Sequence, residues 1–150
     1  MIFFWPIAFG LLLFLSSLSI HTSYDVRAMQ NTAQVEVLGG QFLAYRAAVV
    51  AYARENPGVT GIVPDSVLAL PNWLVKPTEF MAHVEAGESF AYFVPRGPRP
   101  SLIDMGLHPG GGVVSSVGVA AGGKLISGTL MIEGRVLPAV IPNGAIVYVN

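Results

Sequence analysis

The pattern of apolar and polar positions divides the chain into an uncharged amino-terminal stretch, a segment with helical spacing and a region of short alternating runs. Residues 2–20 contain no charged side chain. A helix of that length, rising about 1.5 Å per residue, spans roughly 29 Å, which is the thickness of the hydrocarbon core of a bilayer. We therefore predict that residues 1–21 form a single membrane-spanning anchor.

The same apolar stretch could instead be a signal peptide that is cleaved near Ser19. Ser17 and Ser19 are small residues with the spacing of a cleavage site. A signal peptide normally begins with positive charge, however, and the first Lys or Arg of this chain is Arg27. This difference favours an uncleaved anchor, and a secreted protein is the alternative.

Residues 22–56 have the pattern of a long amphipathic helix that continues the anchor. Large apolar side chains recur three and four residues apart, so they share one helix face. These side chains are Val35, Leu38, Phe42, Tyr45, Val49 and Tyr52. Pro57 ends the helix, because proline disfavours helical backbone in the residue before it. Inside the helix, Gly39-Gly40 predicts either a hinge or a place where another backbone comes close.

The following segment, residues 57–79, is a connector interrupted by four prolines. Proline cannot donate a backbone hydrogen bond, so long regular elements are excluded here. We expect one short helical turn from Asp65 to Leu70. Trp73 and Leu74 are expected to fill the core where the connector crosses it, because a buried aromatic ring is usually structural.

Residues 80–150 have the signals of short strands. Residues 80–85 and 89–94 flank Ala86-Gly87-Glu88, which predicts a hairpin. Further strand segments are expected at residues 113–120, 124–127, 130–132, 136–137 and 145–149. The order of one helix followed by five to seven strands predicts an α+β fold, in which the amphipathic helix packs on a small antiparallel sheet. We expect residues 22–150 to form a single domain.

Composition excludes several classes of function. Hydrophobic residues make up 53% of the chain and charged residues only 11%, against about 25% charged in typical soluble domains. With eight basic and nine acidic residues, the chain has no basic stripe for nucleic acid, and we expect no nucleic-acid partner. The chain has no cysteine, so disulfides, thiolate metal sites and cysteine nucleophiles are excluded.

The residue types used in catalysis do not form a recognisable constellation. His21, His83 and His108 are far apart in the sequence and lack the spacing of zinc ligands. The glycine-rich stretches lack the Lys followed by Ser or Thr of a phosphate-binding loop. We therefore predict no enzyme activity, no catalytic or metal-binding residues and no cofactor.

One loop is the candidate for contact with another protein. Residues 95–100 read Pro-Arg-Gly-Pro-Arg-Pro, a composition that excludes strand and helix. We expect this loop to be exposed and assign Arg96, Gly97 and Arg99 as candidate docking residues. An ordinary solvated turn is the alternative.

An anchor that runs into an amphipathic helix covered by a small sheet resembles type IV pilins. More specifically, the chain is similar to the PilM family encoded with conjugative-plasmid thin pili, which are type IVb systems. The similarity rests on the amino-terminal anchor, on QFLAYRAAVVAY at 41–52 leading to NPG at 56–58, on LPNWL at 70–74, and on IPNGAIVYV at 141–149.

This resemblance implies a non-enzymatic inner-membrane component of a type IV pilus assembly or pilin transport apparatus, the basal body of the pilus. It implies a periplasmic domain, whereas Arg27 and Arg46 after the anchor weakly favour a cytoplasmic one by the positive-inside rule; we follow the family. The expected partners are the membrane and other pilus assembly proteins or pilins. There are two alternatives. One is a minor pilin-like subunit. The other is a secreted binding module that contacts a ligand through Trp73, Tyr92 or the loop of residues 95–100.

Overall fold

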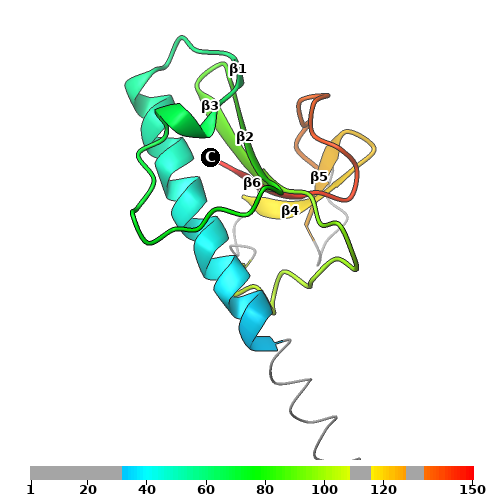
Figure 1. Ribbon diagram of the computed structural model, residues 1–150. Coiled ribbons are helices and arrows are strands. Elements are labelled where there is room, and N and C mark those ends of the chain that lie inside the picture. Colours follow the sequence, from blue (N-terminus) through cyan, green and yellow to red (C-terminus); the bar gives the residue numbers. More distant parts are fainter. Residues whose placement is uncertain (1–31, 109–115, 128–133) are drawn as a thin grey trace, which may run out of the picture. The chain divides into compact units, whose positions relative to one another are not determined.

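The computed structural model describes residues 32–108, 116–127 and 134–150. It has the predicted α+β fold, with one helix packed on a six-stranded antiparallel sheet (Figure 1). Residues Glu36–Asn150 form one compact unit. The predicted anchor, residues 1–21, and the predicted helical residues 22–31 lie outside the described residues. Within the described residues, no helix is both long and apolar enough to cross a membrane.

The helix extends from residue 32, the first described residue, to residue 55. Asn56 closes its carboxyl end, because its backbone N–H and its side-chain Nδ2 both donate to the carbonyl of Tyr52, at 3.0 and 2.9 Å. The last carbonyls of a helix have no partner within the helix, so such bonds stabilise its end. The turn at Pro57 follows directly.

In the described residues the sheet has six strands in the order β1-β2-β3-β6-β4-β5, and every pair is antiparallel. The strands are β1 (Gly61–Ile62), β2 (Phe80–Glu85), β3 (Glu88–Phe93), β4 (Val117–Ala121), β5 (Lys124–Ile126) and β6 (Ile146–Val149). The last strand in the sequence, β6, therefore lies in the middle of the sheet, between β3 and β4 (Figure 1). Because β6 joins the two hairpins, the sheet depends on it.

The hairpin of β2 and β3 has a tighter turn than predicted. Glu85 pairs with Glu88, which leaves a two-residue turn, and Glu88 belongs to β3 rather than to the loop. Both turn residues have positive φ, 51° at Ala86 and 81° at Gly87. Two positive φ values are typical of the type I′ turn, whose twist matches that of the strands.

Both faces of the sheet are covered. On the helix side, Phe80 is the centre of an aromatic cluster, with ring centroids 5.3 Å from Phe42, 5.7 Å from Tyr45 and 5.7 Å from Phe93. On the opposite side, a second core forms against the segment that precedes β6. Its buried residues are Phe90, Tyr92, Ala120, Leu125, Leu137, Ile141, Ala145, Val147 and Val149. The sheet is therefore the middle layer.

The predicted helix face is buried most completely in its middle. Phe42, Tyr45 and Val49 are fully buried. Val35, Leu38 and Tyr52 are half-buried. Burying a large apolar side chain contributes about 1.5–3 kcal/mol before entropy is subtracted, so the central three residues are the main source of adhesion between helix and sheet.

Several predicted elements of the connector and the sheet need correction. The helical turn predicted from Asp65 to Leu70 is a shorter 3₁₀ helix, Asp65–Val67, and β1 was not predicted. Val136 makes only an isolated bridge to Lys124, not a strand. The predicted strand at residues 130–132 and the start of the one at residues 113–120 lie outside the described residues.

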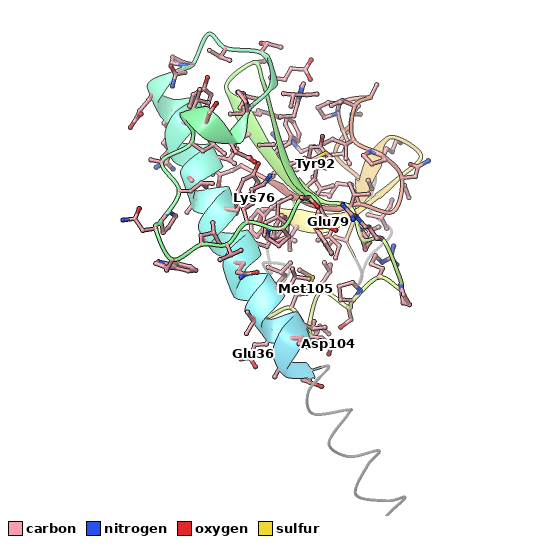
Figure 2. All side chains as sticks on the ribbon, in the orientation of Figure 1. Glu36, Lys76, Glu79, Tyr92, Asp104 and Met105 are labelled. Atoms are coloured by element: carbon pink, nitrogen blue, oxygen red, sulfur yellow. The ribbon has the colours of Figure 1, made fainter. Side chains whose placement is uncertain are left out.

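The two adjacent glycines of the helix have different surroundings. A Cβ added at Gly39 would overlap the backbone carbonyl of Met105, whereas one added at Gly40 would meet nothing within 4 Å. Figure 2 shows Met105 beside the amino-terminal half of the helix. Of the two alternatives for this pair, the close approach of another backbone is the one observed. The fully buried Met105 is held at Gly39 by the turns of residues 101–107.

We expect Gly39→Ala and Gly40→Ala to change stability in opposite directions. Gly39→Ala forces the helix away from Met105, and overpacking of this kind typically destabilises by about 1–3 kcal/mol. Gly40→Ala adds a helix-favouring residue in open space and should stabilise by about 0.5–1 kcal/mol. Denaturant unfolding followed by circular dichroism measures both. Equal effects of the two variants would show that Gly39 is not a contact residue.

Candidate docking surface

The segment between Pro71 and Pro77 presents two large apolar side chains to solvent. Trp73 is 65% exposed and Val75 is 79% exposed. The prediction that Trp73 fills the core was therefore wrong, although the adjacent Leu74 is half-buried. In the turn that begins at Pro71, the N–H of Leu74 donates to the Pro71 carbonyl at 2.9 Å. We call Trp73 and Val75 the Trp73 ridge.

The Trp73 ridge is attached to the helix through the next residue along the chain, Lys76. The Lys76 ammonium lies 2.6 Å from Asp65 Oδ2 and 5.4 Å from the centre of the Tyr45 ring. The Tyr45 hydroxyl in turn makes a long hydrogen bond of 3.5 Å to Asp65 Oδ1. Figure 2 shows Lys76 beside the helix. These contacts fix the backbone that carries Trp73 and Val75.

Burial changes the acidity of two tyrosines in the core. Burial raises the pKa of Tyr45 well above its ordinary value, and the negative charge of Asp65 raises it further. Burial also raises the pKa of Tyr92. Both hydroxyls therefore stay protonated in the folded protein under conditions in which an exposed tyrosine would ionise.

The predicted docking loop is exposed, and one of its arginines is bound to the sheet. Arg96, Gly97 and Arg99 are all exposed. Arg96 Nε lies 2.8 Å from Glu79 Oε1, and its Nη2 donates to Thr78 Oγ1 at 2.8 Å. The pKa of Glu79 lies below its ordinary value, chiefly because the backbone N–H of Glu79 donates a hydrogen bond to its own carboxylate. The hydrogen bond from Thr78 and the charge of Arg96 lower this pKa further. Arg96 therefore holds the loop next to the start of β2.

The residues considered for chemistry are not brought together. His83 lies in β2 with Nε2 3.6 Å from Glu85, while the ring of His108 lies 3.1 Å from the Gly106 carbonyl; His21 is outside the described residues. In the part of the chain that the structure describes, no group of three His, Asp or Glu residues could hold a metal ion. Tyr92, one contact residue of the secreted alternative, is only 1% exposed, so it cannot contact a ligand.

Comparison with known proteins supports the resemblance seen in the sequence. A model of the family described as PilM matches residues 9–149. The chain belongs to the PilM family. The matched region contains every described element, from the helix to β6.

Two crystal structures of PilM proteins are similar to this family member. One, from Pseudomonas aeruginosa 2192, is 34% identical, with 75% of this chain and 91% of that chain covered and a TM-score of 0.45. The other, from Escherichia coli B7A, is 23% identical and has a TM-score of 0.56, with 81% of this chain and 94% of that chain covered. This second similarity supports the fold. No curated protein matches the chain. PilM membership associates the protein with pilus biogenesis.

We expect the stability of this PilM protein to fall as the pH rises above about 10. In the unfolded chain Tyr45 ionises near its ordinary pKa of 10.0, whereas the folded protein keeps the proton because the pKa is raised. The unfolded state then binds fewer protons, and a single such group lowers the free energy of unfolding by up to about 1.4 kcal/mol per pH unit.

Tyr45→Phe should therefore weaken the alkaline loss of stability. Urea unfolding at pH 8, 10 and 11 measures the slope for the variant and for the unmodified protein. At pH 8 the two should differ little, because the bond to Asp65 is long. Identical slopes between pH 10 and 11 would show that Tyr45 ionises equally in both states.

Proposed function

We propose that this protein is a non-enzymatic component of a type IV pilus assembly or pilin transport apparatus, part of the basal body in the bacterial inner membrane. One amino-terminal span would anchor it there, with the α+β domain in the periplasm. The domain would act as a structural and docking protein for other assembly proteins or pilins. The observation that carries this proposal is the match to PilM over residues 9–149.

The exposed loops are better candidates for docking than the edges of the sheet. Exposed edge strands can pair with another chain. Here, β1 has only two residues and is followed by Pro64, which has no N–H to offer. At the other edge, β5 is bonded by the segment of residues 135–137. We therefore propose the Trp73 ridge and the loop of Arg96, Gly97 and Arg99 as contact surfaces.

A minor pilin-like subunit is the second candidate function. The observation that favours it is the packing of one amphipathic helix across an antiparallel sheet. This is the arrangement in which the sequence resembles type IV pilins. The two candidates differ in where the protein resides, because a subunit is incorporated into the filament and an assembly component is not. Immunodetection of this protein in purified, sheared pili would support the subunit, and its absence from them would support the assembly component.

Labelling of a single introduced cysteine tests the location of the domain. Gly97→Cys suits this purpose, since Gly97 is exposed, a Cβ there meets nothing within 4 Å, and the chain has no other cysteine. We expect a membrane-impermeant thiol reagent to label Gly97→Cys in intact spheroplasts. Labelling only after detergent is added would place the domain in the cytoplasm and contradict the proposal.

The Trp73 ridge should matter for pilus formation but not for folding. Trp73→Ser and Val75→Ser replace exposed side chains, so each should change stability by less than about 0.5 kcal/mol. We expect both variants to give fewer pili than the unmodified protein when each is expressed in cells that lack their own copy of the gene. Ile103→Ser is the matched control, because Ile103 is 73% exposed in another segment. Normal piliation with both ridge variants would exclude the ridge as a contact surface.

A further inference from the structure

Arg46 connects the helix to the central strand of the sheet. Its guanidinium carbon lies 3.6 Å from the centre of the Tyr148 ring, so the group stacks on the aromatic face. Its Nη2 donates to Asn150 Oδ1 at 2.9 Å. An arginine fixed by an aromatic stack and a hydrogen bond has lost much of its conformational freedom already. The guanidinium is thus held in position before any partner arrives.

Arg46 differs from the other half-buried cations because it has no carboxylate partner. Among the residues that the structure describes, three Lys or Arg residues are half-buried: Arg46, Lys76 and Arg135. Lys76 is paired with Asp65, and Arg135 with Glu88. Within residues 32–108, 116–127 and 134–150, Arg46 makes no salt bridge. Its side-chain hydrogen-bond partner is the neutral amide of Asn150.

The hydrogen bonds of Arg46 are also incomplete. Its Nε is buried and has no hydrogen-bond partner, although buried donors are almost always paired. The Nε–H and one Nη–H of an arginine form a fork that a carboxylate accepts with its two oxygens. Asn150 offers a single amide oxygen, which satisfies Nη2 and leaves Nε without a partner. The Asn150 side chain is exposed, so it can rotate aside while the backbone stays bonded to Ser89.

We propose that Arg46 is a recognition site for a carboxylate side chain of a partner protein, and that the Asn150 amide occupies this site in the unbound protein. On binding, the carboxylate replaces Asn150 Oδ1 and accepts hydrogen bonds from both Nε and Nη2, while Tyr148 keeps the guanidinium plane in place. This inference rests on the proposed docking function and specifies the chemistry of the partner.

A protein carboxylate is the occupant rather than a small anion in solution. One exposed ion pair contributes little to binding, because water and salt screen both charges. A dissolved anion would therefore occupy a single arginine only at high concentration. A partner protein adds contacts around the ion pair, and Arg and Tyr are the residues in which interfaces concentrate their binding energy.

The first experiment measures the site directly in the purified full-length chain. The Nε–H signal of Arg46 is followed by nuclear magnetic resonance as sodium acetate replaces sodium chloride at constant ionic strength. We expect a saturating shift for Arg46 and none for Arg54, an exposed arginine of the same helix. In Asn150→Asp, which places a carboxylate where the amide was, the signal should already be shifted and should not respond to acetate. No acetate-dependent shift in the unmodified protein would overturn the proposal.

The second experiment tests whether the carboxylate belongs to a partner protein. Cells without their own copy of the gene are complemented with Arg46→Met, which keeps a side chain on Tyr148 but removes the charge, or with Asn150→Asp, which fills the site internally. We expect both to lose pili and Arg54→Met to restore them. Thermal unfolding of each variant separates loss of binding from loss of folding, and Asn150→Asp is expected to fold normally.

The outcomes separate this inference from the function on which it rests. If deletion of the gene leaves piliation unchanged, the proposed function fails. If deletion abolishes pili but Arg46→Met and Asn150→Asp both restore them, the function stands and the carboxylate site is overturned. If acetate shifts the Arg46 signal while both variants restore pili, the site binds small anions only, and recognition of a partner carboxylate is overturned as well.

Discussion

The fold depends on the burial of one helix face against one face of the sheet. Phe42, Tyr45 and Val49 are removed from water completely, and the ring of Phe80 contacts the first two directly. Gly39 allows the same helix to touch the backbone at Met105. The connector lies against the same helix face, where Asp65 and Lys76 pair with each other beside the Tyr45 ring. The surfaces available to partners are thus consequences of how the helix packs.

The elements that could be predicted from the sequence are those whose signal is local. The spacing of Phe42, Tyr45 and Val49 indicates a helix face, because the period of 3.6 residues repeats over several turns. The hairpin was predicted because turn chemistry lies within a few residues. The order of the strands was not predictable in this way, since the pairing of β6 with β3 and β4 joins residues far apart in the sequence.

The proposed contact surfaces illustrate the same limit. Trp73 was predicted to be buried because large aromatic side chains usually are. Only the tertiary structure shows that Trp73 is exposed and that Leu74 and Lys76 are half-buried. Arg46 carried no local signal, since its stacking partner lies 102 positions further along the chain, at Tyr148. The exposure of the loop at residues 95–100 could be inferred from composition, because three prolines in six residues prevent regular pairing.

The central position of β6 has a consequence for the order in which the chain can fold. The backbone of Asn150 exchanges two hydrogen bonds with Ser89, so the sheet closes only when residues near position 150 have been synthesised. Before that, the β2–β3 and β4–β5 hairpins have no strand between them. Contacts of such long sequence separation form slowly, and a nascent chain that lacks β6 keeps one edge of β3 and one edge of β4 unpaired. The sheet is therefore completed only after β6 has been synthesised and has paired with both hairpins.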